Sequence, residues 1–257
     1  MQTLTYEGLH IKNGIQKKVH DALVVEAALQ ININKEPYTV VMRTPADDFE
    51  LIRGLLYAED IYKNTANLTL EVIEKRENGF SIVNVSIPKK KLGKGYLNKR
   101  TLLSVSSCGI CGKQKLEDIS VKGSKLKNNF DFDFYKIEEM FSEMKKLQDT
   151  FEASGGSHAA ALFDINYKLL TIKEDIGRHN AVDKVIGELL INNTLNSVNC
   201  MLVSGRVSYE IISKAFIAKI PYVIAVSACS SLAVDFAKEF GISLIGFSRG
   251  KKATLYS

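Results

Sequence analysis

Strand-like and helix-like patterns alternate along the second half of the chain. Short runs rich in Val, Ile and aromatic residues are separated by stretches with apolar residues at helical spacing. The expected strands cover 158–163, 168–173, 199–203, 222–226 and 243–247, and the expected helices cover 134–148, 181–190, 209–217 and 232–240. This alternation predicts a layered α/β domain with a partly parallel sheet.

The first half carries fewer local signals. Residues 38–43 form a short strand-like run, and Pro45 followed by two carboxylates favours a helix that ends near residue 59. Two further strands, 68–75 and 80–87, flank Asn78-Gly79, a dipeptide typical of tight hairpin turns. These patterns predict an α+β layer.

A polar linker over 122–133 separates the two patterns. We therefore expect an α/β (α+β) protein in two units. The smaller α+β domain covers 1–121, and the layered α/β domain covers 134–257.

Polar residues follow the expected strands of the second half, where α/β sheets bind their ligands. The densest group spans 173–180 and includes Asp175, Arg178 and His179, at a junction between a strand and a helix. A helix N-terminus beside Arg and His suits a phosphate or another anion. For the neighbouring Asp183 and Lys184, a helix cap with a surface ion pair is an equally good interpretation.

The composition is that of a soluble globular protein, with 46% hydrophobic and 25% charged residues in 257. No apolar run is long enough to span a bilayer, and the N-terminus lacks the basic start and apolar core of a signal peptide. We therefore expect a cytoplasmic protein. The net charge of +5 is modest, and no aromatic-and-basic alternation suggests nucleic acid binding.

Two thiols, Cys108 and Cys111, lie two residues apart in a glycine-rich stretch. Positive potential stabilises the thiolate, which is the form that attacks sulfur or binds a metal. The basic residues around the pair are Lys89, Lys90, Lys91, Lys94, Lys99, Arg100, Lys113 and Lys115. This stretch therefore favours persulfide or metal chemistry.

Two other interpretations of the pair are weaker. A structural zinc site needs two further ligands, and Cys200 and Cys229 lie in apolar, strand-like stretches typical of buried thiols. A thioredoxin-like dithiol would suit a short helix over 113–119, but the βαβ context of that fold is not visible in the sequence.

Taken in order, five motifs resemble the FdhD family of sulfur carriers for formate dehydrogenase. They cover 107–112, 155–160, 174–184, 204–210 and 244–247. The resemblance implies a cytoplasmic accessory protein that takes sulfur from a cysteine desulfurase. It would pass this sulfur to the molybdenum (or tungsten) bis-molybdopterin guanine dinucleotide cofactor. It also implies a C-terminal domain similar to the cytidine deaminases and a homodimer.

The resemblance assigns roles to particular residues. Cys108 would carry the persulfide, with Cys111 as its partner, and no metal ligands are implied. The cofactor, or GDP as a partial mimic of it, would contact Phe247, Ser248, Arg249, Gly250, Lys251 and Lys252, together with His158, Asp175, Arg178, His179, Ser204 and Ser227. Gly250 would let the backbone approach a pyrophosphate flanked by three cations.

The implied fold raises the hypothesis of a zinc deaminase, which the sequence does not favour. That chemistry needs a His-x-Glu and a Pro-Cys-x-x-Cys. His158 is followed by Ala159 and Ala160, and no Pro-Cys-x-x-Cys follows. Two hypotheses remain: a sulfurtransferase that forms a persulfide, and a chaperone that only binds the cofactor. The dithiol separates them, because a chaperone has no need of Cys108.

Overall fold

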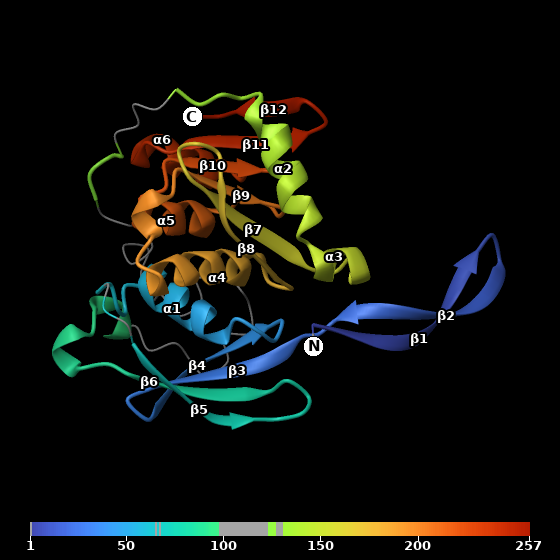
Figure 1. The fold of residues 1–257 in the computed structure, drawn as a ribbon, viewed down its shortest axis with the longest axis horizontal. Helices are drawn as coiled ribbons and strands as arrows, with labels where there is room; N and C mark the ends of the chain where they lie inside the picture. The colour runs from blue at the N-terminus through green and yellow to red at the C-terminus, as the bar shows by residue number, and fades with distance from the viewer. Residues whose placement is uncertain (1, 65, 67, 98–122, 127–130) are drawn as a thin grey trace.

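The computed structural model describes residues 2–64, 66, 68–97, 123–126 and 131–257. It contains three sheets and the helices packed between and over them (Figure 1). The α/β (α+β) class predicted from the sequence is confirmed.

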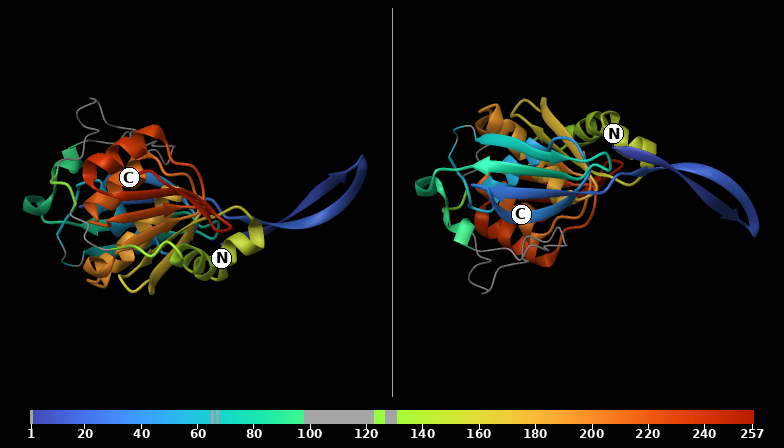
Figure 2. Two further views of the ribbon diagram at one scale, coloured as in Figure 1. Left: turned by 90° about the horizontal axis from the view of Figure 1, so that it is seen from above. Right: turned by 90° about the horizontal axis from the view of Figure 1, so that it is seen from below.

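The N-terminal part is a hairpin followed by a sheet with one helix. Strands β1 (Thr3–Lys12) and β2 (Ile15–Val24) form a two-stranded sheet that projects from the body (Figure 2). Strands β3 (Ala27–Ile33), β4 (Glu36–Arg43), β5 (Thr69–Lys75) and β6 (Ser81–Ser86) form a sheet in the order β4-β3-β6-β5. Helix α1 (Asp48–Ala58) covers it, and the short helical turns η1 (Lys89–Lys91) and η2 (Lys94–Leu97) follow.

The C-terminal part is built on a six-stranded sheet in the order β12-β11-β10-β9-β7-β8. Its strands are β7 (His158–Phe163), β8 (Leu169–Asp175), β9 (Cys200–Val203), β10 (Tyr222–Ala225), β11 (Ser243–Arg249) and β12 (Lys252–Leu255). Its helices are α2 (Lys136–Lys146), α3 (Asp149–Ser154), α4 (Arg178–Ile191), α5 (Tyr209–Ile217) and α6 (Ser231–Phe240), with the short turn η4 (Leu195–Ser197) after α4.

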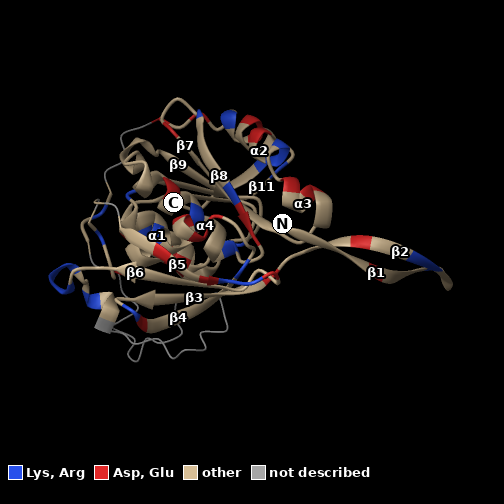
Figure 3. Cartoon of the chain, turned by 60° about the horizontal axis from the view of Figure 1, so that its bottom comes forward, with Lys and Arg blue, Asp and Glu red and all other residues tan. Residues whose placement is uncertain are grey.

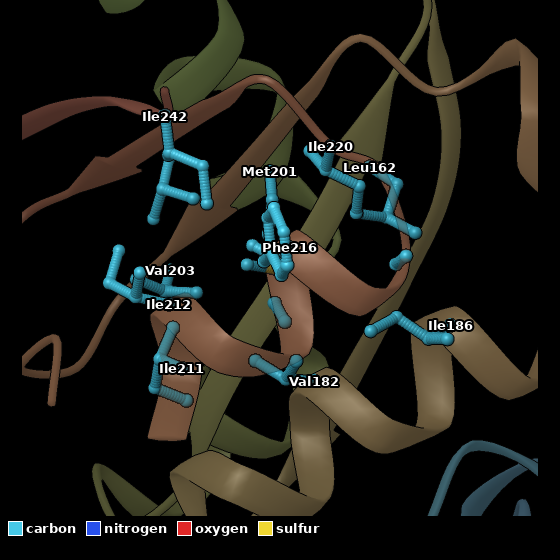
Figure 4. Close-up of a cluster of buried hydrophobic side chains, with 14 of the residues drawn as sticks. Leu162, Val182, Ile186, Met201, Val203, Ile211, Ile212, Phe216, Ile220 and Ile242 are labelled. Carbon is cyan, nitrogen blue, oxygen red and sulfur yellow. The ribbon is translucent and has the colours of Figure 1, made fainter. Parts of the chain in front are cut away.

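Alternation along the central strands produces a core on each face of this sheet. Met201 and Val203 belong to the core beneath α4, α5 and α6, and Figure 4 shows them among apolar side chains of α4 and α5. Cys200 and Leu202 point to the opposite face, which α2 covers with Ile137 and two methionines. The central strands are therefore buried on both sides, as is typical of the parallel part of a mixed α/β sheet.

Helices α1 and α4 lie side by side between the four-stranded and the six-stranded sheet (Figure 1). Gly54 and Gly187 make this close approach possible. A Cβ atom at Gly54 would lie 1.9 Å from the carbonyl oxygen of Asp183, and one at Gly187 would lie 1.8 Å from that of Glu50. Only glycine fits at either position, because real Cβ atoms do not come so near a backbone oxygen.

Most predicted elements are confirmed, with some differences in extent. The strand over 158–163 and the helix over 209–217 have the predicted bounds, and the hairpin closed near Asn78-Gly79 is present. The helix expected over 134–148 is α2, which covers Lys136–Lys146, and the short helix α3 that follows it was not predicted. The prediction did not include β1, β2, β3 and β12.

Candidate functional site

One edge of the six-stranded sheet gathers most of the sequence-predicted site residues. Strands β8, β9, β10 and β11 all run in the same direction, and β7 runs against them. The carboxyl ends of four strands and the amino end of β7 therefore meet at this edge. We call it the strand-end edge.

Successive loops along the strand-end edge are tied together by hydrogen bonds and close contacts. The amide of Ala159 donates to the hydroxyl of Ser204 over 2.9 Å, which joins β7 to the loop after β9. That loop joins the next one through Val207 N and Ala228 O, 3.0 Å apart. The amide of Phe247 then donates to the carbonyl of Ser227 over 3.1 Å. The predicted residues thus lie on one connected row.

Gly205 allows the loop after β9 to lie close to the start of β7 and the start of α4. A Cβ atom there would lie 3.3 Å from both His158 Nδ1 and Arg178 Cβ. The backbone of the β9 loop therefore passes directly beside the first residue of β7 and the first residue of α4.

His179 is a buried imidazole in the first turn of α4. Burial, together with the nearby cations Lys214 and Arg178, lowers its pKa to about 3, although Glu210 Oε2 lies 3.8 Å from Nε2. The ring is therefore neutral at pH 7, with one nitrogen able to donate and the other able to accept. Neither nitrogen has a hydrogen-bond partner among the described residues. A buried polar ring of this kind is expected to bind a ligand or water.

Cationic side chains lie near both His179 and His158. Burial, and then the neighbouring Arg178 and Arg206, lower the pKa of His158. Within the described part of the chain, the Nε atom of Arg178 is also buried without a hydrogen-bond partner. This part of the strand-end edge therefore favours an anion.

Asp175 has a different role from the one predicted. It is fully buried and its carboxylate accepts from Gly177 N, Asn180 Nδ2 and Thr44 N, while Lys184 Nζ lies 2.9 Å away. These four partners occupy all of its acceptor positions. Asp175 thus orders the turn before α4, and this placement argues against the predicted direct contact with a cofactor.

The predicted cofactor segment forms the end of β11 and a hairpin. Arg249 pairs with Lys252 across a two-residue turn made by Gly250 and Lys251, which have φ angles of 51° and 63°. Two positive φ angles are typical of a type I′ turn. Gly250 therefore serves the turn, whereas the sequence predicted close approach of backbone to a pyrophosphate.

The side chains of this segment divide between the core and the surface. Ser248 is buried, and its hydroxyl lacks a hydrogen-bond partner among the residues that the structure describes. Arg249 Nε donates to the carbonyl of Val226 over 3.1 Å, which keeps the segment on the strand-end edge. Phe247, Lys251 and Lys252 are exposed. These three exposed side chains can therefore contact a ligand at the β11–β12 end of the strand-end edge.

Comparison with known proteins assigns this chain to a family. The model of the FdhD/NarQ family matches residues 24–257, which is most of the chain. The chain belongs to the FdhD/NarQ family. This confirms the resemblance found in the sequence.

Relatives of this FdhD/NarQ chain extend over nearly its whole length. A protein of Saccharolobus solfataricus named sulfur carrier protein FdhD is 39% identical over 98% of this chain and 95% of its own. A protein of the same name from Mycobacterium tuberculosis is 38% identical over 92% and 90%. A crystal structure assigned to a formate dehydrogenase accessory protein from Desulfotalea psychrophila has a TM-score of 0.75 at 20% identity and covers 100% of this chain and 97% of that one. That likeness shows the shared fold.

Cys108 and Cys111 lie outside the described residues, so their roles in this FdhD/NarQ chain stay predictions. The other two thiols are unsuited to attack. Burial raises the pKa of Cys200 well above its usual range and that of Cys229 to about 11. Cys200 is buried, as predicted, and Cys229 is partly exposed. The described residues contain no group of three or more His, Cys, Asp or Glu placed to bind a metal ion.

The sequence did not indicate the buried charges beneath His179. Asp183 pairs with Lys214 of α5, and Lys184 pairs with Asp175, so neither forms the surface ion pair considered above. Glu210 accepts from the hydroxyl of Ser208 over 2.6 Å. The one signal in the sequence for these buried ion pairs was the presence of Asp183 and Lys184 on a largely apolar helix. Their partners, Lys214 and Asp175, could not be identified from residue spacing.

Proposed function

We propose that this FdhD/NarQ chain is a sulfur carrier for formate dehydrogenase. The observation that carries the proposal is the match, over 98% of this chain and 95% of the relative, to a protein named as a sulfur carrier. Two features of the chain support this role: a dithiol in the sequence, and a strand-end edge where buried polar atoms of Arg178, His179 and Ser248 have no partner among the described residues.

We propose that the dithiol works by thiol exchange. The thiolate of Cys108 attacks the outer sulfur of a cysteine desulfurase persulfide, which leaves the desulfurase as a thiolate and Cys108 as a persulfide. The thiolate of Cys111 then attacks the inner sulfur of Cys108, releasing hydrosulfide to the metal centre and forming a Cys108–Cys111 disulfide. Two equivalents of a cellular thiol then reduce this disulfide to the two cysteines and are themselves oxidised to a disulfide, so the cycle belongs in the reducing cytoplasm.

The substrate of the second step is proposed to be the molybdenum or tungsten bis-molybdopterin guanine dinucleotide cofactor. Arg178, Arg206 and the cations of the β11–β12 hairpin suit its phosphates. Neutral His179 and the hydroxyl of Ser248 suit polar atoms of a purine or pterin, because each lacks a partner within the described residues. Three of the predicted contacts, His158, Ser204 and Ser227, lie on the same edge.

Intact-mass spectrometry tests the sulfur step. After incubation with a cysteine desulfurase and cysteine, the wild-type chain should gain about 32 Da, and a thiol reductant should remove this mass. Cys108→Ala should not gain it, whereas the control Cys229→Ala should, because Cys229 is a poor nucleophile. If Cys108→Ala still matures formate dehydrogenase fully, the chain is a cofactor-binding chaperone.

A further inference from the structure

Four exposed lysines lie on the short turns η1 and η2, at the end of the molecule away from the β1–β2 hairpin (Figures 1 and 3). They occupy four of the six positions from 89 to 94: Lys89, Lys90, Lys91 and Lys94. Within the part of the chain that the structure describes, none of them forms an ion pair. Because like charges this close repel one another, the cluster favours an anionic partner.

The backbone that carries these lysines is held in place. Asn34 Nδ2 donates to the carbonyl of Ile87, and Asn34 Oδ1 accepts from the amide of the same residue, both over 2.8 Å. The amide of Gly93 donates to the carbonyl of Ile61 over 2.8 Å, and a Cβ atom at Gly93 would lie 2.1 Å from the carbonyl oxygen of Asp60. The turns therefore lie directly against the end of α1. Cations fixed in this way lose little freedom when they bind.

Two hollows adjoin the lysine cluster, and Asn34 lines both. Each combines apolar or aromatic side chains with at least one lysine of the cluster. The smaller hollow, of about 490 Å³, is lined by Tyr62, Leu68, Ile87, Pro88 and Lys91 among others, and the larger, of about 670 Å³, by Ile33, Leu92, Tyr96, Lys89 and Lys94 among others. We call the four lysines and the two hollows the basic surface. A protein segment with apolar side chains beside carboxylates suits it better than a flat anionic bilayer, which would leave the hollows unfilled.

The basic surface and the strand-end edge lie at opposite ends of α1. Thr44, just before the helix, binds Asp175 at the strand-end edge, and Gly93 lies just beyond the other end. A helix of 11 residues is roughly 16 Å long. A partner on the basic surface therefore leaves the strand-end edge open to the cofactor. In the sequence, Cys108 follows Leu97, the last residue of η2, by eleven residues.

We infer that the basic surface docks an acidic segment of the protein that supplies the sulfur. Carboxylates of that segment pair with Lys89, Lys91 and Lys94, and its apolar side chains enter the two hollows. The inference rests on the proposed function, because it takes a cysteine desulfurase as the partner. It adds that sulfur loading and sulfur delivery use opposite ends of the molecule.

Charge reversal on the basic surface tests the docking, with a purified cysteine desulfurase as the probe. Every chain in this experiment carries Cys108→Ala, so that no sulfur moves during the measurement. Lys89→Glu/Lys91→Glu/Lys94→Glu should weaken binding at least about tenfold, because three attractive contacts become repulsive. Calorimetry at two salt concentrations measures the dissociation constant. It should rise with salt for the parent chain and much less for the triple variant.

The matched control is Lys145→Glu/Lys146→Glu/Lys168→Glu. It reverses three exposed lysines on α2 and on the β7–β8 turn, and it changes the net charge by the same amount. This control should bind as the parent chain does. Glu36→Lys should instead bind at least about twofold more tightly, because it replaces an acidic side chain that lines the larger hollow. Melting temperatures confirm that each variant is folded.

Several results overturn the docking. They are a parent chain that does not bind the desulfurase, a triple variant that binds as tightly as its parent, and a control that loses as much affinity as the triple variant. Vesicles of phosphatidylglycerol give a further test. If they bind the parent chain but not the triple variant, while desulfurase binding is unchanged, the basic surface serves a membrane instead.

Sulfur loading separates this inference from the proposed function. With Cys108 restored, the triple variant should gain little mass from the desulfurase. It should still gain about 32 Da from inorganic polysulfide, as wild type does, because the thiolate attacks the terminal sulfur of polysulfide without any docking. A wild-type chain that binds the desulfurase through the basic surface but gains no sulfur from it contradicts the sulfur-carrier proposal and leaves the docking inference intact.

Discussion

His179 is a buried histidine whose surroundings oppose a positive charge. Its ring is desolvated and lies near Lys214 and Arg178, and its pKa is lowered to about 3. Folding therefore favours the neutral form, whereas the unfolded chain binds a proton near pH 6.5. The free energy of unfolding should fall as the pH decreases from 6.5 toward 3.

The first prediction concerns this pH dependence. Between pH 6.5 and about 3, the free energy of unfolding should fall by up to about 1.4 kcal/mol for each unit by which the pH decreases. His179→Gln removes the titrating group, so melting temperature should depend less steeply on pH between 6.5 and 4. His20→Gln, which changes an exposed histidine on the β1–β2 hairpin, should keep the wild-type slope. Equal slopes for wild type and His179→Gln would contradict a neutral buried ring.

At the residue scale, local chemistry was predictable and long-range pairing was not. Arg178 and His179 were found because they are neighbours at one strand-to-helix junction. The structural role of Asp175 depends on the amide of Thr44, 131 residues away in sequence. No spacing rule identifies a partner at that distance, so a buried structural carboxylate was interpreted as a ligand contact.

At the scale of elements, the β11–β12 hairpin presents two adjacent exposed lysines at the end of the strand-end edge. If they contact phosphates, Lys251→Ala/Lys252→Ala should weaken GDP binding about tenfold, since each exposed ionic contact is worth up to about 1 kcal/mol. Calorimetry at two salt concentrations measures this and should show a smaller salt dependence in the variant.

The matched control for this second prediction is Lys145→Ala/Lys146→Ala, another adjacent exposed pair, on α2. It should bind GDP as wild type does. Equal affinity in both double variants would show that the hairpin lysines do not bind the nucleotide.

A third prediction concerns the contact of α1 with α4. Gly187→Ala places a methyl group on the carbonyl of Glu50, so the helices must separate. Overpacking of this kind costs about 1–3 kcal/mol, and the melting temperature should fall by several degrees. Gly8→Ala, where the nearest atoms would be 3.8 Å away, should change it little. Similar melting temperatures for the two variants would show that the helices adjust without cost.

Element predictions succeeded where most of an element is buried. The strand over 158–163 and the helix over 209–217 pack on the main cores, and their apolar spacing shows it. Strand β12 is exposed throughout, and β1 and β2 are mostly exposed, so burial leaves little pattern in them. Strand β3 does alternate apolar and polar residues, and that signal was available but not used.

At the scale of the whole molecule, sulfur loading and sulfur delivery are proposed to depend on different parts of the chain. Arg178→Ala should load sulfur at Cys108 as wild type does, yet activate formate dehydrogenase at least about tenfold less, because the anion site loses a cation. Its melting temperature should stay near that of wild type.

The control for this fourth prediction is Arg76→Ala, which changes an exposed arginine on the β5–β6 hairpin. It should support full activation. If Arg178→Ala fails to load sulfur, or activates the enzyme fully, then the strand-end edge does not serve delivery.

The hydrogen bonds and ion pair of Asp175 also join the four-stranded sheet of the N-terminal part to the six-stranded sheet. This carboxylate binds the amide of Thr44 from the N-terminal part, and Lys184 donates to the carbonyl of the same residue over 3.0 Å. With the α1–α4 contact, these bonds hold residues 2–97 against residues 131–257 without relying on the peptide that connects them. The two pieces, expressed as separate polypeptides, should therefore reassemble by complementation. Such a two-fragment protein lacks the dithiol, and it would isolate nucleotide binding from sulfur chemistry.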